Sequence, residues 1–522
     1  MSYERYLEEI KAMIDDLKAM TTSLGLSNTG DEYKIISELF TYKFLNDKLL
    51  YDYANRSDKT ESFDDFVDFA DDEIPKMRKK HLIDSLYQKQ NEPDFHEVFD
   101  NAFSEVNELN KEIYNIETAS GRKKPLFEKL SVYIRDDGKE IELAKRAINI
   151  LSDNEFKNIG TGGFDYFSSV FEYLIRDYNK DSGKYAEYFT PLFAGRIMAE
   201  VLGNEEQVNN VTVYDPSGGS GTLLLSMANQ IGTENCQVYS QDISQKSTQF
   251  LRINLILNKL AHSLHHIIEG NTLTNPQHLN KDGSLKQFDY IVSNPPFNID
   301  ISKSITTLEN DRHKRFFAGL PSIPKKDKKG MAVYLVFLQH VISSLSKTGK
   351  AAIVVPTGFV SSTNNIQTKI RTKLIKNNWL KGVIHMPANI FATTPTSVSL
   401  LIIDKTKSDD SVYLIDASHV GTKIKIDDNQ RVVLNNADKE YVVSNFVNRI
   451  VIPEKSALVS NVELEENEYI IQAGQYVELL DIEYDFDVKL RIKKIKKSIE
   501  KTIQLNDDLN IQILTKFGEN ND

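Results

Sequence analysis

The spacing of apolar residues changes twice along the chain. At the start, apolar side chains recur every three or four residues, first at Leu7, Ile10, Ile14 and Leu17 and again over residues 35–45. Positions with this spacing share one face of a helix. Acidic segments with helical character continue to about residue 165. The pattern therefore predicts an all-helical first domain over residues 1–165.

A different pattern fills residues 166–405, where short apolar runs alternate with amphipathic helical segments. The clearest runs are residues 211–214, 237–241, 288–293, 351–355 and 399–403. Buried strands separated by helices are typical of an α/β fold with a mostly parallel, doubly wound sheet. Ligands of such sheets bind at the carboxyl ends of the strands.

The last part, residues 406–522, reads as a short β stretch and then a basic amphipathic helix. Its apolar residues Leu490, Ile492, Ile495, Ile499 and Ile503 have helical spacing, and lysines stand between them. The polar run 506–508 is expected to break this helix. We interpret the helix as a contact for a partner's helix, and packing on its own domain is the alternative.

Composition indicates a large intracellular protein. A chain of 522 residues suggests about three domains, and 40% hydrophobic residues are enough for real cores. The single Cys236 excludes an internal disulfide framework. The start has no apolar signal region, and the longest apolar stretch is interrupted by polar residues, so we expect no membrane span.

The formal charge of −12 is unusual for a protein that binds nucleic acid, because lysine and arginine supply most non-specific affinity for phosphates. Two local basic clusters, residues 312–315 and 325–329, follow the run at 288–293. They are candidates for facing a nucleic-acid strand. The alternative is a solvated loop.

A glycine-rich loop follows the first predicted strand. Its sequence is Asp215-Pro216-Ser217-Gly218-Gly219-Ser220-Gly221-Thr222, and a helical run comes next. Glycines let a backbone approach a ligand closely, and the following helix offers unpaired N–H groups. The spacing fits neither a Walker loop nor a dinucleotide fingerprint. A nucleotide-like cofactor other than a triphosphate or dinucleotide is therefore expected.

Two further segments are candidate ligands of that cofactor. Asp242 ends the second predicted strand, where an acid suits a ribose diol, although it could instead cap the next helix. The segment Glu187-Tyr188-Phe189-Thr190-Pro191 precedes a helix expected over 192–202. That helix N-terminus can receive a carboxylate, and a plain capping turn is the alternative.

The tetrapeptide Asn294-Pro295-Pro296-Phe297 ends the apolar run 288–293. An asparagine oxygen fixed beside the Pro295 carbonyl can accept both hydrogens of an exocyclic amine, and Phe297 can stack on the ring that carries it. These are the requirements for methylating a base amine. A proline-rich turn is the alternative for the tetrapeptide alone, but the other three segments accompany it in order.

Together these segments resemble the S-adenosylmethionine-dependent adenine-N6 DNA methyltransferases, and in particular the modification subunit of type I restriction-modification systems. Further similar stretches are residues 33–34, 43–47, 171–175, 252–255, 386–391, 465–469 and 475–477. The resemblance implies a Rossmann-like methyltransferase domain between a helical N-terminal domain and a C-terminal helical tail. Where this family usually has Gly-Asp-Thr-Leu, the chain has Gly270-Asn271-Thr272-Leu273. An amide contact from Asn271 to the cofactor's adenine amine is expected in place of a carboxylate contact.

The resemblance also implies a reaction and partners. The chain is expected to methylate N6 of an adenine flipped out of double-stranded DNA, with S-adenosylmethionine as donor and no metal. Only about 118 residues follow Asp404, too few for a large target-recognition domain, so specificity is expected from a separate subunit. A second copy of the chain, possible association with a motor-nuclease restriction subunit, and a location in the prokaryotic cytoplasm are implied as well.

Other functions remain open at this point. A protein glutamine-amide methyltransferase would use a similar Asn-Pro-Pro geometry, and a non-catalytic scaffold subunit is a second alternative. His262, His265 and His266 lie close together, but no cysteine or acid cluster accompanies them, so we expect no metal site there. Ser217 and Ser220 sit in the glycine-rich loop and form no nucleophile elbow, which disfavours a hydrolase.

Overall fold

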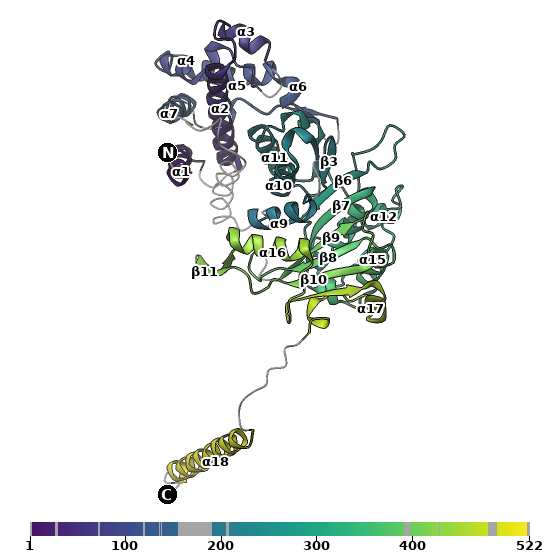
Figure 1. Ribbon diagram of the computed structural model, residues 1–522. Helices are drawn as coiled ribbons and strands as arrows, with labels where there is room; N and C mark the ends of the chain where they lie inside the picture. Colours follow the sequence, from purple (N-terminus) through teal and green to yellow (C-terminus); the bar gives the residue numbers. More distant parts are fainter. Residues whose placement is uncertain are drawn as a thin grey trace. The chain divides into compact units, whose positions relative to one another are not determined.

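The structure is a computed structural model of the chain (Figure 1). It describes residues 3–26, 30–70, 74–117, 121–134, 136, 138–154, 190–204, 208–390, 397–426, 429–478 and 488–518. The chain divides into two compact units, Met1–Val477 and Glu478–Asp522. Each unit is considered by itself.

The first unit begins with helices, as the apolar spacing predicts. They are α1 (Tyr3–Ser23), α2 (Gly30–Asn55), α3 (Phe63–Asp68), α4 (Ile83–Gln88), α5 (Phe95–Leu109), α6 (Lys111–Tyr114) and α7 (Lys139–Asp153). The apolar faces of α1 and α2 are buried, and the Tyr42 and Phe103 rings stack at 4.3 Å between centroids. The region is not entirely helical, because β1 (Ile116–Glu117) pairs with β2 (Lys123–Lys124).

A nine-stranded sheet follows, in the order β13-β10-β8-β9-β7-β6-β3-β4-β5. Its strands are β3 (Val211–Asp215), β4 (Cys236–Asp242), β5 (Ile267–Glu269), β6 (Phe288–Ser293), β7 (Leu345–Pro356), β8 (Leu380–His385), β9 (Val398–Asp404), β10 (Ser411–Asp416) and β13 (Ser456–Ser460). The pairs β10/β8, β7/β6, β6/β3, β3/β4 and β4/β5 are parallel. Strand β9 runs antiparallel to both of its neighbours, and β13 runs antiparallel to β10. The predicted fold class is confirmed.

Helices cover both faces of the sheet (Figure 1). On one face lie α9 (Leu192–Leu202), α10 (Thr222–Ile231), α11 (Gln245–Leu257) and α16 (Asn436–Asn448); on the other lie α13 (Tyr334–Ser344), α15 (Asn365–Lys376) and α17 (Asn461–Glu466). Successive residues of β7 alternate between the two cores: Ala352 and Val354 belong to the first, Ala351 and Ile353 to the second. Burial on both faces explains why residues 351–355 of this strand form a continuous apolar run.

Shorter elements complete the first unit. They are α12 (Ile305–Glu309), α14 (Gly358–Ser361) and the hairpin of β11 (Thr422–Ile426) and β12 (Asn429–Val433). The sheet does not end at the expected boundary near residue 405, since β10 and β13 extend it. The buried Arg371 fastens the following tail to α15: its Nε donates to the Tyr469 carbonyl (2.7 Å), and its Nη atoms donate to the carbonyls of Phe359 (2.6 Å) and Ser362 (2.7 Å).

The second unit contains α18 (Val488–Gly518), a single helix of 31 residues. The break expected at residues 506–508 is wrong, because the helix continues through them. Asparagine and aspartate lower helix propensity by only some tenths of a kcal/mol each, whereas a new helix would need a new nucleus. No helix in the described parts of the chain is long and apolar enough to cross a bilayer.

Candidate functional site

Three of the predicted site residues lie at one edge of the sheet. Asp215 is the last residue of β3, Asp242 is the last residue of β4, and Asn294 directly follows β6. The three strands are parallel neighbours in the order β6-β3-β4. Because parallel neighbours end at the same edge, the loops that carry these side chains meet there.

The glycine-rich loop between β3 and α10 packs too closely for larger residues. A Cβ added at Gly218 would lie 2.1 Å from Ser240 Oγ, and one added at Gly221 would lie 2.3 Å from Leu251 Cδ1. Gly221 also has φ of +89°, and Gly219 has φ of +54°. The carbonyl of Ser220 accepts a hydrogen bond from Asn254 of α11 (2.8 Å). The loop is thus held tightly between β4 and α11.

Asp242 accepts a backbone hydrogen bond at each carboxylate oxygen. Gly219 N–H donates to Oδ2 (3.0 Å), and Ser244 N–H donates to Oδ1 (2.8 Å). Burial raises the pKa of Asp242, and these two bonds counteract it. Asp242 does not cap α11, because Ser244 is the N-cap and accepts from Ser247 N–H (3.3 Å). The alternative reading of Asp242 as a capping residue is therefore wrong, and its carboxylate faces the glycine-rich loop.

Asp215 links that loop to the tetrapeptide. Its Oδ1 accepts from the Ser217 N–H (2.9 Å) and hydroxyl (3.3 Å), and the Ser217 hydroxyl lies 3.0 Å from the hydroxyl of Ser293. Ser293 immediately precedes Asn294. Burial raises the pKa of Asp215 to about 7, so this carboxyl is readily protonated near neutral pH.

Asn294 is held by the segment that precedes α9. Its Nδ2 donates to Thr190 Oγ1 at 3.1 Å, and the Thr190 side chain is buried. Pro191 is the N-cap of α9, at the turn expected to cap this helix, and the cap involves no side-chain hydrogen bond. Because the Asn294 amide nitrogen is bound to Thr190, its Oδ1 is directed away from that contact. Glu187, Tyr188 and Phe189 lie outside the described residues.

The remaining residues of the tetrapeptide form a rigid, partly covered loop. Pro295 is buried, while Pro296 and Phe297 are half-buried. The Phe297 ring meets the Tyr334 ring edge-on, with centroids 6.2 Å apart. One side of the aromatic ring is therefore supported by the start of α13.

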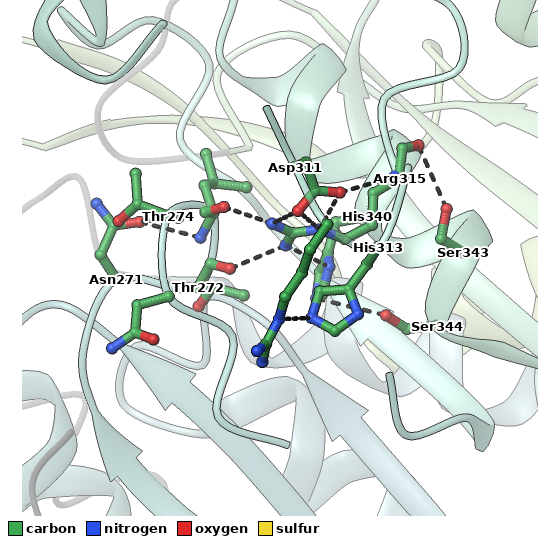
Figure 2. Close-up of polar contacts among 12 residues, drawn as sticks. Asn271, Thr272, Thr274, Asp311, His313, Arg315, His340, Ser343 and Ser344 are labelled. Atoms are coloured by element: carbon green, nitrogen blue, oxygen red, sulfur yellow. Dashed lines mark hydrogen bonds and ion pairs between the residues drawn. The ribbon is translucent and has the colours of Figure 1, made fainter. Parts of the chain in front are cut away.

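Asn271 follows β5 and uses its side chain to form a turn (Figure 2). Its Oδ1 accepts from the N–H groups of Leu273 (3.0 Å) and Thr274 (3.1 Å). The same oxygen is the atom expected to accept from the cofactor's adenine amine. The single amide oxygen thus stabilises its own turn, whereas an aspartate would have a second oxygen to offer.

Sequence reasoning missed the role of Arg315. It belongs to the basic cluster expected to face a nucleic-acid strand, yet only Arg312 and Lys314 of that cluster are exposed, and Arg315 is fully buried. Arg312 and His313 line a concavity with residues 282–285 and Gln287, which lead into the start of β6 rather than its end. In the sequence, the apolar pair Phe316-Phe317 directly after the cluster was the feature that could have indicated burial of Arg315.

The histidines near residue 265 make contacts within the protein. His262 Nε2 lies 3.1 Å from the Cys236 carbonyl, and the His266 ring stacks on Tyr239 at 3.8 Å. Burial lowers the pKa of His265 and of His266. Among the described residues, no group of three histidine, cysteine, aspartate or glutamate side chains is placed to hold a metal ion.

The chain is similar to known proteins over most of its length. Residues 163–485 match the family model described as N-6 DNA Methylase. The type I restriction enzyme MpnII methylase subunit of Mycoplasma pneumoniae is 26% identical over 509 residues, covering 92% of this chain and 89% of that protein. The HindI methylase subunit of Haemophilus influenzae is 25% identical over 334 residues, covering 61% of this chain and 70% of that protein.

Solved structures share the fold. The type I restriction-modification methyltransferase subunit from Streptococcus thermophilus superposes with a TM-score of 0.71 at 21% identity, covering 92% of this chain and 100% of that one. A modification subunit of a putative type I enzyme from Vibrio vulnificus gives a TM-score of 0.57 at 16% identity, covering 93% and 98%. Neither a protein-amide methyltransferase nor a scaffold finds support in these likenesses. The chain belongs to the N-6 DNA methylase family, as a DNA adenine methyltransferase of the type I modification-subunit class.

Proposed function

We propose that the site at the ends of β3, β4 and β6 binds S-adenosylmethionine and a flipped adenine together, with Asn294 as the residue that holds the adenine N6 amine. Enzymes of this family use S-adenosylmethionine, which when bound supplies an electrophilic methyl group on a sulfonium. The observation that supports the proposal most is the Asn294–Thr190 hydrogen bond, which fixes the orientation of the amide at the edge where the glycine-rich loop also lies.

Each residue of the site has a separate role in this proposal. The glycine-rich loop and Asp215 hold the methionine part of the cofactor, Asp242 accepts from its ribose hydroxyls, and Asn271 lies beside its adenine. Asn294 Oδ1 and the Pro295 carbonyl accept the two hydrogens of the target amine, so that its lone pair is directed at the methyl group. Phe297 stacks on the flipped base, which offsets part of the unstacking cost of a few kcal/mol. The proton released from N6 passes to solvent.

We place DNA against the lysine-rich run at residues 325–329. All of these residues are exposed, and the run lies close to the tetrapeptide, because the Met331 carbonyl accepts from Ile299 N–H (3.2 Å) and Tyr334 N–H donates to the Phe297 carbonyl (3.5 Å). Lys328 also lowers the pKa of Asp300, after the stronger effect of hydrogen bonds from Ser302. A local positive patch beside the target-base pocket can bind phosphates although the whole chain is acidic.

Changing the four lysines of this run to glutamine is expected to weaken binding of the assembled enzyme to DNA by about tenfold or more at low salt, and to lower the slope of log K against log salt by about two to four. S-adenosylmethionine affinity is expected to stay unchanged. Fluorescence anisotropy over a salt series measures both quantities. The matched control changes four exposed lysines of the helical region, Lys59, Lys79, Lys89 and Lys129. An equal effect in both variants would contradict a local role.

Sequence specificity is assigned to a separate subunit, which α18 contacts. Its isoleucines at 492, 495, 499 and 503 are each about half exposed and recur on one face. A second copy of the chain joins the same complex, and a motor-nuclease subunit can add to it. The related proteins are described as methylase subunits of type I restriction enzymes, which supports a complex of several subunits.

Transfer of labelled methyl from S-adenosylmethionine to unmethylated DNA tests the function. Label on adenine N6 is expected only when the specificity subunit is co-expressed, with at least about 100-fold less for the chain alone. The triple variant Ile495→Glu, Ile499→Glu, Ile503→Glu is expected to abolish the stimulation of methyl transfer by the specificity subunit. The matched control carries Ser498→Glu, Lys501→Glu and Gln504→Glu on the opposite face of α18 and should retain that stimulation. Full activity of the chain alone would contradict the division of labour.

A further inference from the structure

Arg315 lies in the long connection from the tetrapeptide to α13, and its side chain is only 1% exposed. All five of its N–H groups have acceptors (Figure 2). Nη1 donates to the carbonyl of Thr272 (3.0 Å) and to His340 Nδ1 (3.1 Å). Nη2 donates to the carbonyl of Leu273 (2.6 Å) and to Asp311 Oδ1 (2.8 Å), and Nε donates to the Asp311 carboxylate at 3.1 Å.

The two carbonyls belong to the turn that begins at Asn271. The hydroxyl of Thr272, on the same turn, reaches the carbonyls of Pro216 (2.7 Å) and Gln241 (3.2 Å). Pro216 is part of the glycine-rich loop, and Gln241 immediately precedes Asp242. The turn is therefore held by the glycine-rich loop and β4 through the Thr272 hydroxyl, and by Arg315 through its carbonyls.

We propose that Arg315 is a positioning residue for the cofactor's adenine: it holds the Asn271–Thr274 turn in the shape that binds the ring. The inference rests on the proposed function, because it takes the site at the ends of β3, β4 and β6 to be the cofactor site. Arg315 reaches this turn from the connection that carries the target-base residues. The same side chain thus joins the two halves of the site, one for the cofactor and one for the adenine to be methylated.

The neighbours of Arg315 explain why a buried charge is tolerated here and how the guanidinium is oriented. Asp311 pairs with it at i,i−4, and although burial acts to raise the pKa of Asp311, the hydrogen bonds from Arg315 keep it below the usual value. His340 accepts at Nδ1, so its proton is on Nε2, which lies 3.0 Å from Tyr214 Oη. Burial and the Arg315 charge hold the pKa of His340 well below its usual value.

A lysine cannot replace this arrangement. Its ammonium is one point with three donors, whereas the planar guanidinium reaches two carbonyls, a carboxylate and an imidazole at fixed angles. In Arg315→Lys the charge stays paired with Asp311, but at least one carbonyl of the turn loses its donor. The turn is then free to relax, and the adenine pocket changes shape without a change in any residue that contacts the cofactor.

The test compares binding of S-adenosylmethionine to the full chain and to two lysine variants by isothermal titration calorimetry. Arg315→Lys is expected to weaken binding by about tenfold or more, and to weaken binding of 5′-methylthioadenosine, which lacks the amino-acid part, by a similar factor. Arg371→Lys is the matched control. Arg371 is also fully buried and donates to three backbone carbonyls, but these belong to Phe359, Ser362 and Tyr469, none of them in the Asn271–Thr274 turn.

Equal losses of thermal stability in both variants, with a loss of affinity only in Arg315→Lys, would support the inference. Affinity within about twofold of the wild-type value in a folded Arg315→Lys would overturn it. If Arg315→Lys does not fold, Asp311→Asn decides by the same criteria, because it keeps the guanidinium but removes the charge that orients it. Failure of the wild-type chain to bind S-adenosylmethionine would instead contradict the proposed cofactor site itself.

Discussion

Replacing Asn294 by alanine is expected to reduce methyl transfer by at least about 10³-fold while the affinity for S-adenosylmethionine stays within about twofold. The change removes the oxygen that accepts from the target amine. It also leaves Thr190 Oγ1 without the amide nitrogen to which it is bound at 3.1 Å. The effect falls on the rate of the chemical step, because the interaction with the amine matters most as its lone pair attacks.

The measurement is single-turnover transfer by the complete complex, with cofactor binding followed separately by calorimetry. Asn377→Ala is a suitable control, since that asparagine is exposed at the end of α15 and bonds only to a neighbouring carbonyl among its described contacts. Transfer by Asn294→Ala above about a tenth of the wild-type rate would contradict the assigned role. Loss of cofactor affinity would instead place Asn294 in the cofactor site.

The position of Asn294 was predictable because it depends on local sequence. An apolar run that ends in Asn-Pro-Pro-Phe specifies a strand followed by a rigid loop, and a glycine-rich loop after the first strand specifies another. In a parallel sheet both loops must come to the same edge. To predict that Asp215, Asp242 and Asn294 lie at the same edge, it was enough to know that each follows or ends a parallel strand. The order of the strands in the sheet was not needed.

Features that depend on tertiary packing were not predictable in this way. Arg315 reads as part of a solvated basic run, and only the fold shows that two carbonyls, Asp311 and His340 surround it. The position of β9 between β7 and β8 likewise cannot be derived from its apolar pattern, which is the same for a parallel and an antiparallel buried strand. The hydroxyl of Thr190 suits a helix cap as well as it suits the contact with Asn294.

Cofactor affinity is expected to fall as the pH is lowered through about 7, by up to about tenfold per pH unit, and so by about 100-fold at pH 5. The cause is Asp215, whose pKa is raised to about 7 by burial and, more weakly, by the charge of Asp242. The cofactor carries positive charge on its ammonium and its sulfonium. Binding then favours the ionised carboxylate, and a proton bound to Asp215 must leave first.

Protonation of Asp215 has the opposite effect on the stability of the fold, so the pH dependence of cofactor affinity and that of stability can be separated. A raised pKa in the folded state means that the contribution of Asp215 to stability is fully present below its unfolded value of 3.8 and is lost as the pH rises through about 7. Protonation of Asp215 therefore does not unfold the cofactor-free chain. His278 acts the other way: burial lowers its pKa to about 4, so its contribution is present above 6.5 and is lost as the pH falls through about 4.

Calorimetry between pH 5 and pH 7.5 measures the effect in a range where His278 stays neutral in the folded chain, because its folded-state pKa is about 4. Asp215→Asn is expected to bind more weakly than the wild-type chain at pH 7.5 but with little dependence on pH, because the replacement cannot gain or lose a proton. Thermal melting at each pH confirms that the fold persists. A wild-type affinity that is constant over this range would show that Asp215 does not carry the charge that meets the cofactor. In that case Asp242 would remain as the acid of the site, through its contact with the glycine-rich loop.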